Sequence, residues 1–389
     1  MKKYLIAATL LVGLLLLVVA CQPAEAPAPE TIEVTKEVIV TQEVEVPVTV
    51  EPPAPWEVAH ENVPVSLHET TEGMRYFYSA ENGGFETLTG VPYDDLHCKD
   101  CHVGQNEEGE VRCEACHITQ VTDAPPQFKC IACHGRQNFE IMAKKPDGTP
   151  GMTDVHYAKG MQCINCHGVD DVHGDGESYN SLHEMDLVAC SDCHGEVSME
   201  VQAHSVHNEN IDCAGCHVQN VINCVNCHFD TELEGGGKVA QTRYFNWKFL
   251  LKDAQTGKYT TGIIMSMVTG DQTFVAAAPF YGHTISKPDP ATVCDDCHQS
   301  AAVAEYNETG KINIQTWNQD EGKFTFATGV IPFPADYQDA FVMDFVTRDG
   351  DTWNEGKTNW TFLKTGVDLW QMLYAEPLET MPPQMDLTP

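Results

Sequence analysis

The sequence CAGCH stands at residues 213–217, and CVNCH follows at residues 224–228. Each has the pattern CxxCH, in which a histidine directly follows the second of two cysteines that are three positions apart. The pattern occurs eight times and uses 16 of the 17 cysteines in the 389 residues. Its cysteines are Cys98, Cys101, Cys113, Cys116, Cys130, Cys133, Cys163, Cys166, Cys190, Cys193, Cys213, Cys216, Cys224, Cys227, Cys294 and Cys297. Its histidines are His102, His117, His134, His167, His194, His217, His228 and His298.

The spacing within CxxCH has a chemical reason. Two thiols three positions apart lie on one side of a helical turn, where both can form thioether bonds with the vinyl groups of one haem. The adjoining imidazole can then bind the iron from the proximal side. Zinc sites and disulfides also use cysteine pairs, but neither requires a histidine after every second cysteine. With 17 histidines in the chain, eight such coincidences have a probability on the order of 10⁻¹¹, so we interpret CxxCH as the attachment signature of c-type haem.

On these eight motifs, residues 98–298 resemble the multihaem c-type cytochromes. The resemblance implies an octahaem member with eight covalently attached haem c groups. Seven motifs lie within residues 98–228, which is fewer than 20 residues per haem. Segments this short cannot build layers of helix and sheet around each porphyrin. We therefore expect little regular secondary structure there, with short helices and loops around a packed chain of haems. Cys213 and Cys224 are so close in sequence that we expect their haems to be neighbours.

Nine histidines lie outside the motifs, which is close to one for each haem. His156 and His183 each stand seven residues before a motif, in a repeated unit. The candidate distal ligands are His68, His97, His156, His173, His183, His204, His207 and His283. His60 is the spare, because it lies beside a proline-rich segment and farthest upstream of any motif. For any single histidine, a surface or core position is the alternative. Two axial imidazoles leave no open coordination position and favour a low potential, which suits electron transfer.

The N-terminus predicts export. Residues 1–20 have a basic start and an apolar run, and a small residue precedes Cys21, as in a bacterial lipoprotein signal peptide with lipidation at that cysteine. A retained membrane anchor is the alternative, although the run is short for a bilayer. We therefore expect a protein that is lipid-anchored to the membrane and faces the periplasm or the cell exterior. Residues 21–56 are rich in Pro, Glu and Val and predict an extended tether, with an edge strand as the alternative.

The remaining sequence divides into two predicted domains. Residues 57–232 form a seven-haem domain, in which the segment before the first motif packs on the first haems and supplies His68. A glycine-rich linker follows, and residues 238–389 form a β-rich domain that carries the eighth haem near its start. Its aromatic residues are interpreted as core rather than as a ligand cage. The strand-like runs in this domain are residues 311–317, 323–327, 340–347 and 359–364.

The charge balance limits the possible partners. The chain has 57 acidic and 22 Lys or Arg residues, for a net charge of −35. Such a chain repels phosphate backbones, which excludes nucleic acid as a partner. The acidity favours a basic docking face on a redox partner protein.

Three functions remain open at this point. The first is an electron carrier between a membrane donor and a periplasmic or external acceptor, as in extracellular electron transfer. The second is an octahaem redox enzyme, of the nitrite, hydroxylamine or tetrathionate type, with one open haem; Lys129 or Lys159 could ligate an unusual iron in such an enzyme. The third is the protomer of a cytochrome filament. Because all eight motifs end in His and distal candidates are plentiful, the carrier is favoured, and no catalytic residue is assigned.

Overall fold

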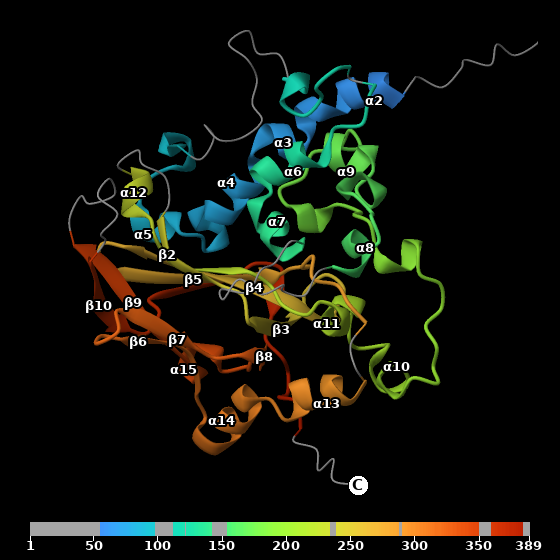
Figure 1. The fold of residues 1–389 in the computed structure, drawn as a ribbon. Coiled ribbons are helices and arrows are strands. Elements are labelled where there is room, and N and C mark those ends of the chain that lie inside the picture. The colour runs from blue at the N-terminus through green and yellow to red at the C-terminus, as the bar shows by residue number, and fades with distance from the viewer. Residues whose placement is uncertain are drawn as a thin grey trace, which may run out of the picture. The chain divides into compact units, whose positions relative to one another are not determined.

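The computed structural model describes residues 55–97, 112–120, 122–141, 154–233, 239–287, 290–349 and 359–383 (Figure 1). The predicted signal peptide, Cys21, nearly all of the predicted tether and the first motif lie outside the described residues. Residues 53–389 pack as one unit. No helix in the described segments is both long enough and apolar enough to cross a membrane.

The described residues before residue 218 form short helices joined by loops, as the sequence predicts. The longest of these, α2, has eight residues. The helices are α2 (Pro55–Asn62), α3 (Leu67–Thr70), α4 (Glu72–Tyr78), α5 (Glu86–Thr89), α6 (Gln127–Cys133), α7 (Gly135–Ile141), α8 (Val155–Ala158), α9 (Val169–His173), α10 (Gln202–His207) and α11 (Cys213–His217).

Six of the seven described motifs lie on a helical turn. Three begin with a 3-10 turn, at Cys113–Ala115, Cys163–Asn165 and Cys190–Asp192. The third motif ends α6, the sixth is α11, and the eighth ends α13 (Pro290–His298). The helical geometry expected for two thiols on one side is therefore confirmed at these six motifs. The seventh motif differs, because it forms strand β1 (Asn223–His228).

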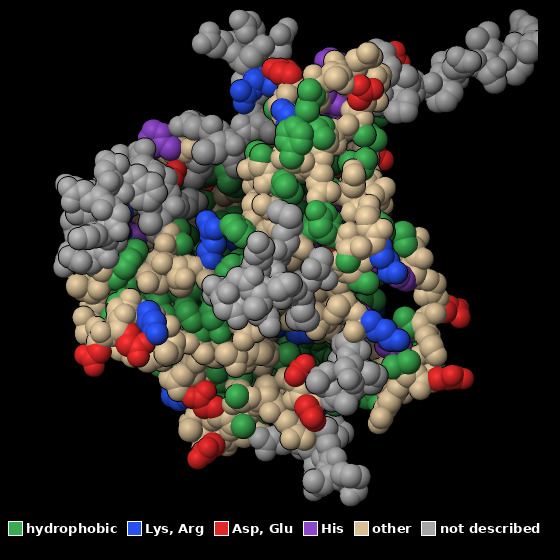
Figure 2. All heavy atoms as spheres, viewed as in Figure 1, with side chains coloured by type: hydrophobic (Ala, Val, Ile, Leu, Met, Phe, Trp, Pro, Cys, Tyr) green, Lys and Arg blue, Asp and Glu red, His purple; other side chains and the backbone are tan. Residues whose placement is uncertain are grey.

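Between residues 112 and 207 the described helical part lacks a protein core of its own. Among the described residues between 112 and 207, Ile141 is the one buried hydrophobic side chain. Large apolar side chains in the same segment are exposed instead. They are Ile118, Phe128, Phe139, Ile164, Val169, Leu182, Val188, Val197, Met199, Val201 and Val206. Figure 2 shows green apolar side chains at the surface in the region of α6 and α7. The exposed side chains are available as contacts for a bound apolar group.

The C-terminal part is built on two sheets. An eight-stranded sheet has the path β11-β5-β4-β1-β2, with β3 also pairing β4, β8 and β12, and a four-stranded sheet has the order β10-β9-β6-β7. The strands of the larger sheet are β1, β2 (Val239–Tyr244), β3 (Trp247–Asp253), β4 (Tyr259–Thr269), β5 (Gln272–Pro279), β8 (Gly329–Pro332), β11 (Leu369–Met372) and β12 (Ala375–Glu376). The smaller sheet contains β6 (Ile312–Asn318), β7 (Lys323–Phe326), β9 (Phe341–Asp349) and β10 (Asn359–Thr365). The helices of this part are α12 (Asp230–Leu233), α13, α14 (Ala301–Thr309) and α15 (Tyr337–Ala340).

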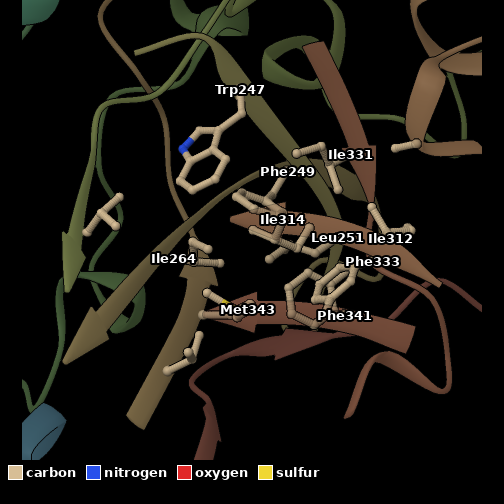
Figure 3. Packing of buried hydrophobic residues seen from close by; sticks show 14 of the residues in the cluster. Trp247, Phe249, Leu251, Ile264, Ile312, Ile314, Ile331, Phe333, Phe341 and Met343 are labelled. Atoms are coloured by element: carbon tan, nitrogen blue, oxygen red, sulfur yellow. The ribbon is translucent and has the colours of Figure 1, made fainter. Parts of the chain in front are cut away.

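The two sheets enclose the main hydrophobic core. Phe249 of β3 meets Phe341 of β9 edge to face, with ring centroids 6.2 Å apart. Phe333 packs on the ring of Phe341, with ring centroids 4.7 Å apart. Figure 3 shows these side chains together with aliphatic residues from both sheets, all within one buried cluster. The expectation that the aromatic residues of this region form an ordinary core is met by this cluster.

All four strand-like runs of the sequence form strands, namely β6, β7, β9 and β10. The strands between residues 239 and 279 were not predicted. Strand β4 explains why, since eight of its 11 residues are buried and no alternation of polar and apolar side chains marks it as a strand.

The predicted border between the two domains falls inside the larger sheet. Strand β1 carries the seventh motif, and it pairs antiparallel with β2 and parallel with β4. The seven-haem region therefore contributes a strand to the sheet of the β-rich region, and the domain limits themselves stay a prediction.

Asn226 ties the two sheets together. Its side-chain amide donates to the carbonyl oxygen of Val346 at 2.7 Å and accepts from the N–H of Val346 at 2.9 Å. The Asn226 side chain is fully buried. Loss of both bonds leaves two buried polar groups without partners.

We therefore expect Asn226→Ala to lower the free energy of unfolding by about 2–4 kcal/mol. Denaturant unfolding followed by circular dichroism measures this change on protein with full haem content. Asn313→Ala is the matched control, because this side chain is exposed on β6, and its effect should stay within about 0.5 kcal/mol. Equal effects of the two substitutions would contradict the role of Asn226.

Candidate haem sites

Six motif histidines lie opposite six histidines from outside the motifs. Their ring centroids are 5.9 to 6.4 Å apart. The pairs are His117–His173 at 6.1 Å, His134–His68 at 6.0 Å, His167–His283 at 6.2 Å, His194–His156 at 5.9 Å, His217–His204 at 6.4 Å and His298–His207 at 6.1 Å. A metal ion that binds one nitrogen of each ring at about 2 Å separates two centroids by roughly 6 Å. The spacing of every pair therefore fits one metal ion between two imidazoles.

The residues around these pairs also fit a haem. Each pair contains one histidine that directly follows a CxxC sequence, so two thiols stand beside one of the two imidazoles. The exposed apolar side chains of the helical part lie in the same segment as four of the six paired motifs. Two thiols, two imidazoles and an apolar surface are the groups that a covalently bound porphyrin requires. When bound, the iron of such a group supplies one-electron redox chemistry.

Backbone carbonyls orient many of the paired rings. The Nδ1 atom of His117 lies 2.8 Å from the carbonyl oxygen of Asp123, and Nδ1 of His173 lies 3.1 Å from that of Val169. The corresponding contacts are His217 with Ser286 at 3.0 Å, His204 with Ser198 at 3.1 Å and His298 with Pro383 at 2.8 Å. A ring that donates its Nδ1–H to a carbonyl keeps the lone pair on Nε2 for a metal.

Carboxylates take the same position at three other rings. Nδ1 of His156 lies 3.2 Å from Asp154, that of His167 lies 3.6 Å from Asp171, and that of His283 lies 3.7 Å from Glu140. A carboxylate behind a metal-binding imidazole makes the imidazole a stronger donor. The pair of the fourth motif, His167 with His283, therefore has a carboxylate next to each ring.

Two of these carboxylates are buried and hold the backbone as well. Glu140 is fully buried and accepts hydrogen bonds from the N–H groups of Ile222 and His283. Asp154 accepts from the N–H groups of His156 and Ile285. They fix the segment that carries His283 against α7 and α8.

Burial also keeps several rings neutral. Burial lowers the pKa of His167, of His173 and of His207 below the ordinary value for histidine. The neutral ring is the form that binds a metal ion.

Thiols of different motifs interact in a fixed order. The Cys130 thiol lies near that of Cys163, and the Cys190 thiol lies near that of Cys213. Cys116 likewise neighbours Cys133, Cys166 neighbours Cys193, and Cys216 neighbours Cys294. The motifs therefore follow one another in space as second, third, fourth, fifth, sixth and eighth. The sixth motif adjoins the eighth, although the seventh is closer to it in sequence.

The seventh motif has different surroundings. Cys227 and His228 are 9% and 7% exposed, and they belong to a strand that pairs on both sides. The His228 ring faces the indole of Trp360, with centroids 6.4 Å apart and planes tilted by 56°. Asn226, between the two cysteines of this motif, has a φ of 52°. An aromatic ring of the smaller sheet thus stands near His228 at the distance that separates the paired histidines elsewhere.

The three other histidines outside the motifs lie in separate places. His60 is exposed on α2, as expected for the spare histidine. His97 ends a described segment directly before the first motif. His183 packs on Tyr374, with ring centroids 5.1 Å apart, and burial lowers its pKa. Tyr374 has a φ of 53° and donates a hydrogen bond to Glu184.

Sequence reasoning assigned a distal role to eight histidines, and the structure brings six of them opposite a motif histidine. It does not bring His183 to such a position within the described residues. Lys129 donates to the carbonyl oxygen of Ala115 at 2.9 Å, and Lys159 is exposed. The roles of Glu140, Asp154 and Trp360 were not predicted. An acidic residue two positions before a candidate ligand, as in Asp154 and His156, was the available signal.

Comparisons with known proteins find two partial similarities. No protein-family model matches the chain. The chain is 26% identical over 204 residues to the dissimilatory sulfite reductase MccA of Wolinella succinogenes, and the match covers 44% of this chain and 29% of that protein. The matched region is thus less than a third of the relative's length. Among solved structures, the octaheme cytochrome c of Shewanella oneidensis is similar, with 16% identity and a TM-score of 0.30 over 44% of this chain and 59% of that chain.

The class predicted from the eight motifs, a multihaem c-type cytochrome, rests on those motifs. The number of haems, the lipoprotein signal peptide and the individual ligands stay predictions.

His204 and His207 offer a test of the pairs, because one short helix carries both. We expect His204→Ala and His207→Ala each to convert one low-spin haem to high spin while all covalent haem stays attached. Low-temperature EPR of the oxidised protein measures this conversion. His60→Ala is the control and should leave every signal unchanged. If the spectra of both helix variants match the parent, the two histidines are not ligands.

Proposed function

We propose that the chain is an exported multihaem c-type cytochrome that passes electrons from a membrane donor to a periplasmic or external acceptor. The observation that carries the proposal is the set of six imidazole pairs with a spacing of 5.9 to 6.4 Å. Two imidazoles on one iron leave no position for a substrate, and they hold the iron in one geometry in both redox states. These are the properties of an electron carrier rather than of a catalyst.

The order of the motifs supports the same function. Thiols of neighbouring motifs lie close together from the second motif to the sixth and then to the eighth. Residues of this chain would therefore hold these haems in one row. Among the described motifs the row runs from the second to the eighth, and the haem of the eighth motif is one place where a partner could exchange electrons.

The location and the partners follow from the sequence. We propose that Cys21 is lipidated and that the protein faces the periplasm or the cell exterior. The charge of −35 suits a redox partner with a basic docking face.

A reductase is the second candidate, and two observations favour it. One is the similarity to a dissimilatory sulfite reductase, which covers less than half of this chain. The other is the seventh motif, where the indole of Trp360 faces His228. An indole is not a haem ligand, so Trp360 would form the wall of a pocket there rather than a second axial bond. A small oxyanion such as sulfite is the substrate class for this candidate.

Carbon monoxide distinguishes the two candidates, because it binds ferrous iron that has an open position. For the carrier we expect no carbon-monoxide adduct in the reduced protein and negligible turnover with sulfite, nitrite, hydroxylamine or tetrathionate. Optical spectra before and after gas addition measure the adduct, and His60→Ala is the control variant with the same expectation. An adduct whose spectrum changes in Trp360→Leu would instead support the reductase and place its site at the seventh motif.

A further inference from the structure

Lys248 is a buried cation on strand β3. Its side chain is 8% exposed, and its ammonium group donates to the carbonyl oxygens of Gly215 and Val218 at 3.0 and 2.9 Å. Both carbonyls belong to the end of α11, which is the sixth motif. The ammonium therefore caps the C-terminal end of the helix that carries this motif.

The same ammonium lies between two motifs. It lies near the thiols of Cys216 in the sixth motif and Cys297 in the eighth. Cys216 also interacts with Cys294, so the two motifs adjoin each other at this point. On the other side, helix α10 supplies the opposing histidine of both motifs, His204 for the sixth and His207 for the eighth.

Burying this charge is costly. In the described part of the chain no carboxylate accepts a hydrogen bond from Lys248, and the acidic group that acts on it, Asp296, does so through space. Burial lowers the pKa of Lys248, which reflects the cost of removing an ammonium from water. A neutral amide could cap the same two carbonyls at a lower cost. The presence of a lysine therefore points to a role for the charge itself.

The fourth motif, inside the row, has the opposite electrostatics. The pair His167–His283 has Asp171 behind one ring and the fully buried Glu140 behind the other. Negative charge next to the axial imidazoles disfavours an added electron, whereas positive charge near an iron favours it. The sixth and eighth motifs have carbonyls behind His204, His217 and His298, and Lys248 beside their thiols.

We propose that Lys248 is a positioning residue that raises the reduction potentials of the haems held by the sixth and eighth motifs, which makes this junction the electron-accepting end of the row. The proposal rests on the proposed electron-transfer function. Lys248 adds positive charge at the place where the sixth motif meets the eighth. Each transfer toward it moves one electron between neighbouring irons, and no bond forms or breaks.

The test compares three substitutions in the complete holo-protein. Lys248→Gln removes the charge but keeps a donor for the carbonyls, and Lys248→Met removes both while keeping the length of the side chain. Lys248→Arg retains the charge. Lys252→Gln is the matched control, because Lys252 lies on the same strand but pairs with Glu376 and Glu379 at the surface.

Optical redox titration and EPR at fixed potentials give the readout. At a fixed potential, we expect Lys248→Gln to lower the ratio of reduced to oxidised haem roughly tenfold for two haems, a shift of about 59 mV for a one-electron couple. The shift should persist at high salt, since a buried charge is little screened. Lys248→Arg and Lys252→Gln should keep the potentials of the parent.

Each other outcome has a distinct meaning. Unchanged potentials in both Lys248→Gln and Lys248→Met, with full haem content, would show that Lys248 is only a helix cap and would overturn the inference. Loss of haem from both neutral variants, together with altered haem potentials in Lys248→Arg, would also overturn the inference. In that case the charge of the side chain would not be the cause of the effect. If the parent itself lacks low-spin haems in EPR, the proposed function fails, and that result is separate from any effect of Lys248.

Discussion

The pairing of imidazoles across a fixed gap is the constraint on which the helical part of this structure depends. Between residues 112 and 207 the described chain buries one hydrophobic side chain, so ordinary packing does not hold these loops in place. Yet six pairs of rings from distant segments agree in spacing to within 0.5 Å, the difference between 6.4 and 5.9 Å. A bound group that contacts both rings explains the regularity, because each iron would join two segments that share no protein core. The porphyrins would then replace the hydrophobic core, and the exposed apolar side chains would be their contacts.

The sheets provide what the helical part lacks. Their core is dense and aromatic, and the same fold carries His283, the carbonyl of Ser286 and Lys248, all of which act on motifs from elsewhere in the chain. Glu140 connects the two regions through the N–H groups of Ile222 and His283. The β-rich part is therefore a scaffold against which axial ligands are positioned, and this explains why the seventh motif can be a strand of the sheet itself.

Local features were predictable from the sequence, whereas partners across space were not. The motifs, their helical turns and four strands follow from spacing and side-chain type. His156 was singled out because it stands seven residues before the fourth motif, but its ring faces His194 of the fifth. Such a pairing is set by how loops fold back, and spacing along the chain does not determine it. Lys248 was missed because it lies in the apolar run Trp247–Leu251, where a single lysine was the only signal of a buried charge.

The electrostatics distinguish the fourth motif from the sixth and eighth motifs, which the pairing alone does not. Bis-imidazole sites of equal environment would exchange electrons without preference. Here carboxylates lie next to both rings of the fourth motif's pair, His167 and His283. At the sixth and eighth motifs, backbone carbonyls lie next to three of the four paired rings, and the ammonium of Lys248 lies near the thiols of both motifs. Because Glu140 and Lys248 are buried, their charges act on their neighbours with little screening by solvent or salt. A net charge of −35 disfavours the reduction of every haem in the protein. The buried ammonium of Lys248 therefore has its greatest effect on the haems nearest to it.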